Sequence, residues 1–211
     1  MKNALSRTAA PVVLVAALTG LGLTATAGTP ASAAAEASHT SVVAYEVDNV
    51  HSTVLFKVGY FGVSNFWGRF NELSGSYLID MDNLADSTLE ISVKAESIDT
   101  NNGGRDKHLR NPDFFDARSH PEIAFTSSSF SKVDDDTVRV TGSLTFRGRS
   151  REVSADLDYF GSGPDAWGNE RSGFQGTFTI NRSEFGSTYG IDNNSLADQV
   201  DLTVAVSGTR K

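Results

Sequence analysis

Apolar and polar residues alternate along most of the chain after residue 50. The clearest run is 53–60, in which every second side chain is apolar: Val54, Phe56, Val58 and Tyr60. A period of two is typical of a strand that buries one face and exposes the other to water. The pattern returns in the runs 77–81, 89–95, 123–125, 138–146, 153–159, 174–180 and 200–206. It predicts an all-β domain.

Short turn signals separate these runs, among them the aspartates 134–136 and the Gly-rich stretch 161–168. Short connections predict antiparallel neighbours. About eight or nine strands of this kind fit either a β-sandwich or an up-and-down barrel, and the period alone does not distinguish the two. A closed barrel has one advantage, because it leaves no exposed edge strand.

The stretch 99–121, DTNNGGRDKHLRNPDFFDARSHP, breaks the alternation. It combines four basic residues, two histidines, four aspartates and two adjacent phenylalanines. Such a mixture of charged and aromatic side chains is what an active site would require, which makes this stretch the first candidate for chemistry. The competing interpretation is a short helical insertion around residues 102–116, placed between two strands of the barrel.

Asn111-Pro112 is expected to break the helix of this insertion, because proline lacks an amide hydrogen and restricts the residue before it. We expect Phe114 and Phe115 to pack against the barrel, where they would close one end or gate a pocket. Local ion pairs are expected to hold the insertion in place, with three contributors: Arg105, Asp106 and Arg110.

The first 33 residues have the composition of a secretory signal peptide. Two cationic residues precede or border an apolar run over 9–23, and small residues follow up to Ala33, where we expect cleavage. The run is shorter than the roughly 20 residues that span a bilayer, so a retained anchor is the weaker alternative. Residues 34–43 are expected to form a flexible lead-in and residues 44–211 the barrel domain. The protein would then be secreted or periplasmic.

The chain carries 18 Lys and Arg against 26 Asp and Glu, a formal net charge of −8, and loss of the leader makes it more acidic. An acidic surface repels nucleic acid and anionic headgroups, so we expect neither nucleic-acid binding nor stable membrane insertion after cleavage. The absence of cysteine excludes disulfides, a thiolate nucleophile and a lipoprotein anchor. The sequence leaves open whether the protein forms a homodimer.

Candidate chemistry elsewhere is sparse. The four histidines do not form HExxH or His-x-His, so no metal site is predicted. Ser52 or Ser119 could be combined with a histidine and Asp106, but neither serine lies in a GxSxG elbow. The pair His51-Ser52 is expected to make hydrogen bonds that fix one end of the barrel, with a ligand role as the alternative. No catalytic residue and no cofactor are predicted.

The predicted inward face is unusually aromatic, and small residues lie among the rings: Gly142, Ala155 and Gly176. Rings beside missing side chains can interdigitate into a filled core. The alternative is an elongated apolar cavity, because barrels of this size can hold one ligand. Such a cavity would be lined by Phe56, Val58, Tyr60, Phe70, Ile91, Val93, Phe125, Leu144, Phe146, Phe174 and Phe178.

A set of motifs spread over about residues 44–209 resembles the YceI-like family, and its order along the chain makes it more specific than any single motif. The motifs are Tyr45-x-x-Asp48-x-x-His51-Ser52, Gly62-Val63-Ser64, Gly68-Arg69-Phe70, Ser97-Ile98-Asp99-Thr100, Arg105-Asp106-x-His108-Leu109, Asp113-Phe114-Phe115-Asp116, Pro121-x-Ile123-x-Phe125, Gly142-x-Leu144-Thr145-x-x-Gly148 and Asn181-Arg182-x-x-Phe185-Gly186.

The resemblance implies an antiparallel, lipocalin-like, eight-stranded β-barrel that bacteria export. It implies a ligand too, a polyprenyl lipid, an isoprenoid quinone or another long-chain amphiphile, held for transport, storage or protection. The family offers no established catalytic residue and is not generally regarded as enzymatic. Family members usually carry a histidine at Tyr60, and tyrosine neither titrates near neutral pH nor binds metal as imidazole does. The alternatives are a secreted enzyme acting on a lipid or glycan, and a stress-response barrel without ligand.

Overall fold

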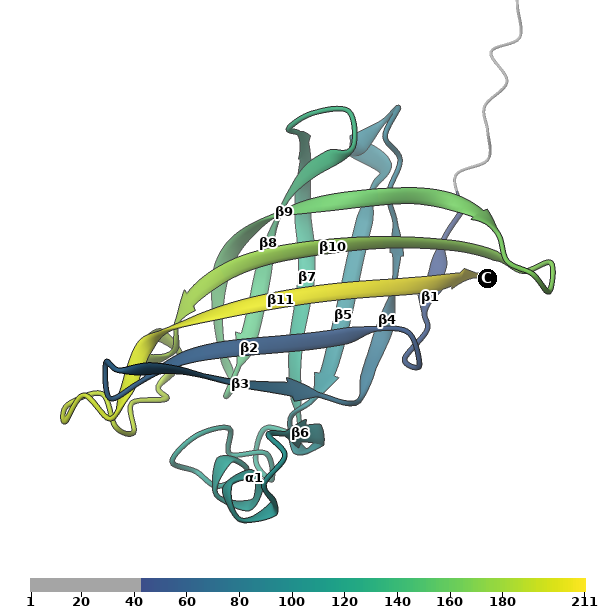
Figure 1. Ribbon diagram of the computed structural model, residues 1–211. Coiled ribbons are helices and arrows are strands. Elements are labelled where there is room, and N and C mark those ends of the chain that lie inside the picture. Colours follow the sequence, from purple (N-terminus) through teal and green to yellow (C-terminus); the bar gives the residue numbers. More distant parts are fainter. Residues whose placement is uncertain (1–42) are drawn as a thin grey trace, which may run out of the picture. The chain divides into compact units, whose positions relative to one another are not determined.

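The computed structural model describes residues 43–211 and contains one antiparallel sheet (Figure 1). The predicted signal peptide and residues 34–42 of the lead-in lie outside the described residues. The strands are β1 (Tyr45–Val47), β2 (Thr53–Tyr60), β3 (Ser64–Phe70), β4 (Leu73–Leu78), β5 (Thr88–Lys94), β6 (Ile98–Asp99), β7 (Glu122–Lys132), β8 (Thr137–Phe146), β9 (Arg149–Pro164), β10 (Glu170–Asn181) and β11 (Leu196–Arg210).

The sheet closes on itself as an eight-stranded barrel. Its ring runs β1, β4, β5, β7, β8, β9, β10, β11 and returns to β1, while β2, β3 and β6 extend the same wall. β11 pairs with β1 near Arg210 and with β2 over most of its length, so β1 and β2 together act as one barrel strand. The predicted closed barrel is confirmed, and the sandwich is excluded.

The strand boundaries agree in part with those predicted from the alternation of apolar and polar residues. β2 covers the predicted run 53–60. The predicted strand over 77–81 is wrong beyond Leu78, because β4 ends there and the chain turns into the 3-10 helix η1 (Leu84–Asp86). β7 continues through the serines 127–129, which carry no alternation, because its backbone pairs with β8 along that length.

Three neighbouring barrel strands are interrupted side by side. β1 and β2 are separated by residues 48–52, β3 and β4 by residues 71–72, and β5 and β6 by the 3-10 helix η2 (Ala95–Ser97). Side chains replace the missing ladder bonds: the Leu73 amide donates to Asn49 Oδ1 at 2.6 Å, and the Glu72 amide donates to Ser97 Oγ at 3.1 Å. The breaks let the wall bend without exposing unpaired amides.

One end of the barrel, here called the closed end, is filled by rings. Tyr45 stacks on Tyr77 with centroids 5.6 Å apart, and Tyr77 meets Phe174 edge-on at 5.0 Å. Tyr77 and Phe174 are each 1% exposed. Burial raises the pKa of Tyr77 to about 12, and its hydroxyl has no hydrogen-bond partner among the described residues. The closed end is therefore a packed core.

An ionic cluster joins two turns at the closed end. Arg171 lies 2.7 Å from Asp48 through Nη1 and 2.8 Å from Asp165 through Nε. The Arg171 guanidinium, with help from His51, holds the pKa of Asp48 at about 2. Ser52 Oγ donates to the Ser207 carbonyl at 3.2 Å and accepts from the Ser207 amide at 3.0 Å. His51 and Ser52 thus take part in hydrogen bonds at this end, as expected.

The insertion at the opposite end contains the short helix α1 (Gly103–Leu109), which lies below the barrel wall in Figure 1. The Asn102 side chain caps the helix by accepting from the Arg105 amide. The helix ends at Leu109, two residues before Asn111, in agreement with the predicted break at Asn111-Pro112. No helix among residues 43–211 is long and apolar enough to cross a membrane.

The predicted ion pairs of this insertion are wrong. Within residues 43–211, no salt bridge involves Arg105, Asp106 or Arg110. Instead Arg105 donates to the Thr100 hydroxyl and carbonyl, and buried Asp106 accepts from the Thr100 amide at 2.9 Å. Arg110 donates to the carbonyls of Glu96 and Ile98. The charged side chains thus fasten the insertion to the backbone of residues 96–100, which directly precedes it.

Candidate functional site

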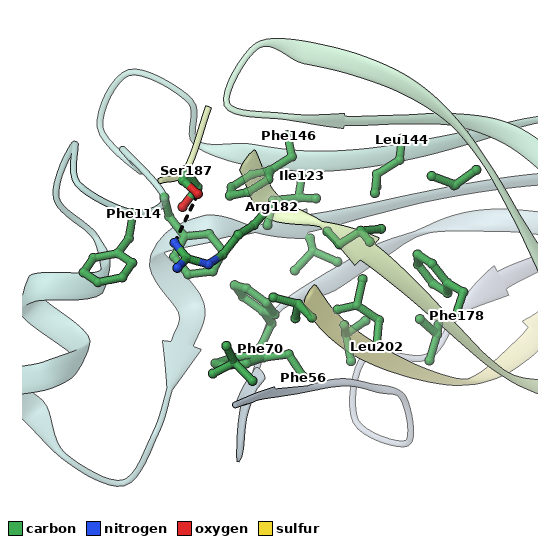
Figure 2. Close-up of a pocket in the computed structure, with 18 of the residues that line it drawn as sticks. Phe56, Phe70, Phe114, Ile123, Leu144, Phe146, Phe178, Arg182, Ser187 and Leu202 are labelled. Carbon is green, nitrogen blue, oxygen red and sulfur yellow. Dashed lines mark hydrogen bonds between the residues drawn. The ribbon is translucent and has the colours of Figure 1, made fainter. Parts of the chain in front are cut away.

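An apolar cavity of about 660 Å³ occupies the barrel interior. It runs from the rings of the closed end to the end that carries α1, here called the mouth. Figure 2 shows phenylalanine, leucine and isoleucine side chains pointing into it from several strands. The volume falls within the range of about 300–1,000 Å³ of small-molecule sites. The interior is therefore not a filled core.

The structure places every residue that the sequence proposed for the wall along this cavity. Phe56, Val58 and Phe70 come from β2 and β3, Ile91 and Val93 from β5, Phe125 from β7, Leu144 and Phe146 from β8, and Phe174 and Phe178 from β10. Tyr60 lies at the mouth and is half-exposed. Binding of a ligand by these side chains stays a prediction.

Neighbouring side chains cover the two glycines among the small residues of the wall. A Cβ at Gly142 would lie 2.6 Å from the Phe125 ring, and a Cβ at Gly176 would lie 2.4 Å from Leu157 Cδ2. Phe56 covers Gly68 across the β2–β3 ladder in the same way. Glycine thus permits rings and aliphatic groups to lie flat on the wall. The cavity is the space left between such side chains, so interdigitation and a cavity occur together.

Aromatic side chains of the insertion bridge the mouth. Phe115 contacts Phe70 edge-on with centroids 5.4 Å apart and Phe146 at 5.3 Å. Phe114 is buried, and its ring centroid lies 4.9 Å from that of Tyr189, which belongs to the loop between β10 and β11. Phe114 and Phe115 pack against the barrel as expected, and both line the cavity. Their gating role stays a prediction.

Arg182 is the most unusual lining residue. It belongs to the 3-10 helix η3 (Arg182–Phe185) and is only 6% exposed. Its guanidinium donates to the carbonyls of Ala197 at 2.9 Å, Ser187 at 3.1 Å and Tyr189 at 2.8 Å, and Figure 2 shows it directed toward Ser187. Burial lowers the pKa of Arg182. No described carboxylate forms a salt bridge with it, so its direct partners are neutral carbonyls, while Asp198 acts on its charge from a greater distance.

Two further basic side chains line the mouth, and no Asp or Glu does so within residues 43–211. Arg105 lies over the Phe66 ring at 4.3 Å, and His108 is edge-on to Tyr189 at 5.3 Å. The polar groups of the site therefore gather at the mouth. Sequence reasoning did not identify Arg182 as a lining residue because only the folded-back 182–196 loop brings it to the cavity.

The catalytic combination of Ser52 with Asp106 is not assembled in the structure. Ser52 is bonded at the closed end, whereas Asp106 holds Thr100 beside α1, so these two residues do not meet. Within residues 43–211, no three His, Cys, Asp or Glu side chains are grouped to hold a metal ion. The cavity offers apolar contacts along its length and polar groups only at its mouth.

The chain matches known proteins over almost all of its described length. The YceI-like domain model matches residues 45–207. A UPF0312 protein of Pectobacterium atrosepticum is 34% identical over 167 residues, which cover 79% of this chain and 85% of that protein.

Solved structures share the barrel. BcnA of Burkholderia cenocepacia superposes with a TM-score of 0.70 at 23% identity, and the match covers 76% of this chain and 98% of BcnA. A polyisoprenoid binding domain from Saccharophagus degradans, implicated in plant cell wall breakdown, gives a TM-score of 0.62 at 15% identity and covers 80% and 99% of the two chains. At these identities, the likeness is one of fold.

Proposed function

The chain belongs to the YceI-like family, and on that premise we propose that it binds one long-chain isoprenoid, a polyprenyl lipid or an isoprenoid quinone, inside the barrel. The observation that carries this proposal is the cavity of about 660 Å³, apolar along its length and polar only at the mouth. The polyisoprenoid binding of the Saccharophagus degradans domain supports it. The protein is then a binding protein rather than an enzyme.

The physical basis is the removal of the apolar tail from water. Each square ångström of apolar surface buried contributes roughly 25 cal/mol, so a few isoprene units supply micromolar affinity or better. The rings of Tyr77 and Phe174 stop the tail at the closed end. Cavity depth therefore selects tail length, and the headgroup lies near the polar atoms of the mouth, such as Arg182 and Ser187.

The biological role follows from the location that we propose. An exported barrel would carry, store or protect a lipid in the aqueous space outside the cytoplasmic membrane. Intact mass measurement of the protein recovered from culture medium and periplasm tests this part. A mass that lacks residues 1–33 is expected, and a full-length cytoplasmic product would contradict export.

Native mass spectrometry of the purified protein, followed by organic extraction, tests the ligand. We expect one long-chain lipid per barrel. Phe178→Glu places a carboxylate in the cavity wall and should abolish retention, whereas Thr177→Glu changes the exposed face of the same strand and should retain the lipid. A wild-type barrel that is empty and binds no added polyprenol or quinone would disprove the proposal.

A further inference from the structure

Large apolar side chains are exposed around the mouth. They lie at the end of β2, on the turn between β2 and β3, on β3 itself and on the loop before β11, and are here called the apolar rim: Tyr60, Phe61, Val63, Trp67 and Tyr189. Val63 is 84% exposed and Trp67 is 55% exposed. Scattered exposed apolar residues are common, but such a group on one end of a protein marks a contact surface.

The rim is held in a fixed conformation. Phe61 adopts a φ of 49°, a left-handed conformation that bulky residues rarely adopt, and Gly62 follows at 68°. The Phe61 amide donates to the Ser195 carbonyl at 3.1 Å, which joins the turn to the neighbouring loop. The Tyr60 and Phe61 rings meet edge-on at 4.6 Å. The turn thus presents its side chains outward on an ordered backbone.

The rim lacks charge along its main segment. Residues 58–68, VGYFGVSNFWG, contain no Asp, Glu, Lys or Arg, although 21% of the whole chain is charged. Lys57 borders this segment, with its Nζ 5.9 Å from the centroid of the Trp67 ring, and its flexible stem can keep the charge in water. The uncharged residues themselves can enter an apolar phase without desolvating an ion. Tyrosine and tryptophan are the side chains that settle at the boundary of a bilayer.

The rim continues into the cavity. Tyr60, Phe61 and Tyr189 are exposed and also line the cavity, so apolar surface extends without a break from outside the barrel to its interior. Tyr189 in turn contacts Phe114 of the insertion. A lipid that moves along this surface would keep its tail out of water.

From these observations we propose that the apolar rim inserts into the interface of a lipid bilayer, with the mouth facing the lipid. The proposal rests on the proposed function, because an isoprenoid ligand is obtained from or delivered to a membrane. Contact is transient and driven by apolar burial, since the chain has a net charge of −8 and gains nothing from anionic headgroups. Binding should therefore occur on phosphatidylcholine and change little with salt.

The test compares two double variants of the purified protein. Val63→Ser with Trp67→Ser alters the rim at residues that do not line the cavity. Val50→Ser with Trp167→Ser removes the same residue types from the closed end, where they are 83% and 84% exposed. Both changes are on the surface, and equal melting temperatures will show that both variants fold.

Three quantities are measured: co-sedimentation with phosphatidylcholine vesicles, the rate of quinone transfer from vesicles, and loading with the same quinone from detergent. We expect the rim variant to lose about tenfold in vesicle affinity and transfer rate and to load normally from detergent. The closed-end variant should match the wild type in all three.

Equal co-sedimentation of the rim variant and the wild type would overturn the proposal. So would a wild-type dimer that the rim substitutions convert to a monomer in light scattering, because the rim would then cover a second copy. If detergent loading fails in the wild type, the proposed ligand is wrong, while co-sedimentation of the empty barrel still decides the role of the rim.

Discussion

The two ends of the barrel use aromatic residues in opposite ways. At the closed end, Tyr77 and Phe174 are almost wholly buried and meet each other ring to ring. At the mouth, Phe61 and Trp67 point into solvent, and Phe115 covers the opening from an insertion. The comparison indicates that the closed end stabilises the fold, and we propose that the mouth meets ligand and membrane. Substitutions at the two ends should therefore differ in what they change.

The largest effect is expected from Phe174→Ala. Loss of a fully buried phenylalanine leaves a cavity and should lower the free energy of unfolding by about 3–5 kcal/mol. Tyr189→Ala at the mouth, where the ring is half-exposed, should cost less than about 1 kcal/mol. Urea denaturation measures both. Similar losses of unfolding free energy for the two variants would refute the proposal that the closed end, and not the mouth, stabilises the fold.

A change to the insertion should speed release of the ligand. Replacing Phe114 and Phe115 together with alanine removes the rings that cover the opening, and bound isoprenoid should leave about tenfold faster, equivalent to about 1.4 kcal/mol. Transfer to excess acceptor vesicles gives the rate. Phe160→Ala, an exposed ring on β9 outside the cavity lining, is the control. Unchanged release from a folded double variant would rule out a gate.

Acid should weaken the closed end through its ionic cluster. The pKa of Asp48 is about 2 in the folded protein, below the ordinary value of 3.8, so its contribution is present above about pH 4 and is lost as the pH falls toward 2. Arg171→Gln should remove about 1 kcal/mol at neutral pH and flatten the dependence of stability between these values. Urea midpoints of the wild type and the variant, measured between pH 2 and pH 4 and at neutral pH, test this prediction. Parallel dependences of the midpoint on pH for the two proteins would contradict it.

The smallest effect concerns the Tyr77 hydroxyl. It is buried without a partner among the described residues, so Tyr77→Phe should raise the free energy of unfolding, by up to about 1 kcal/mol. The same urea titration applies. A destabilised variant would reveal a hydrogen bond to an ordered water.

The barrel was predictable because most strands bury one face, and the side-chain period reports that directly. β2 is the clearest example, with the same bounds in pattern and structure. β7 shows the limit, since its serines 127–129 pair through the backbone and leave no trace in hydropathy. Closure itself did not follow from the period. It depends on β11 pairing with β1, a contact between the two ends of the domain.

The cavity wall was predictable for the same reason as the strands, because an inward-facing side chain in a barrel lines the interior. The mouth was not. Arg182 reaches the cavity through hydrogen bonds to carbonyls of a loop that folds back on it, and no spacing in the sequence encodes that path. The sequence left open whether a ring covers Gly142 or space remains there, because the position of the Phe125 ring depends on the register of two strands.

The closure of the barrel by β1 and β11 also has a practical consequence. Tyr45 pairs with Arg210, and the Lys211 amide donates to the Ala44 carbonyl at 3.2 Å, so the described chain begins and finishes at the closed end. Figure 1 shows the C-terminus beside β1, away from α1. A tag or fusion partner on the C-terminus would attach the protein through its closed end. An immobilised sensor for isoprenoids could thus be built with its opening left free.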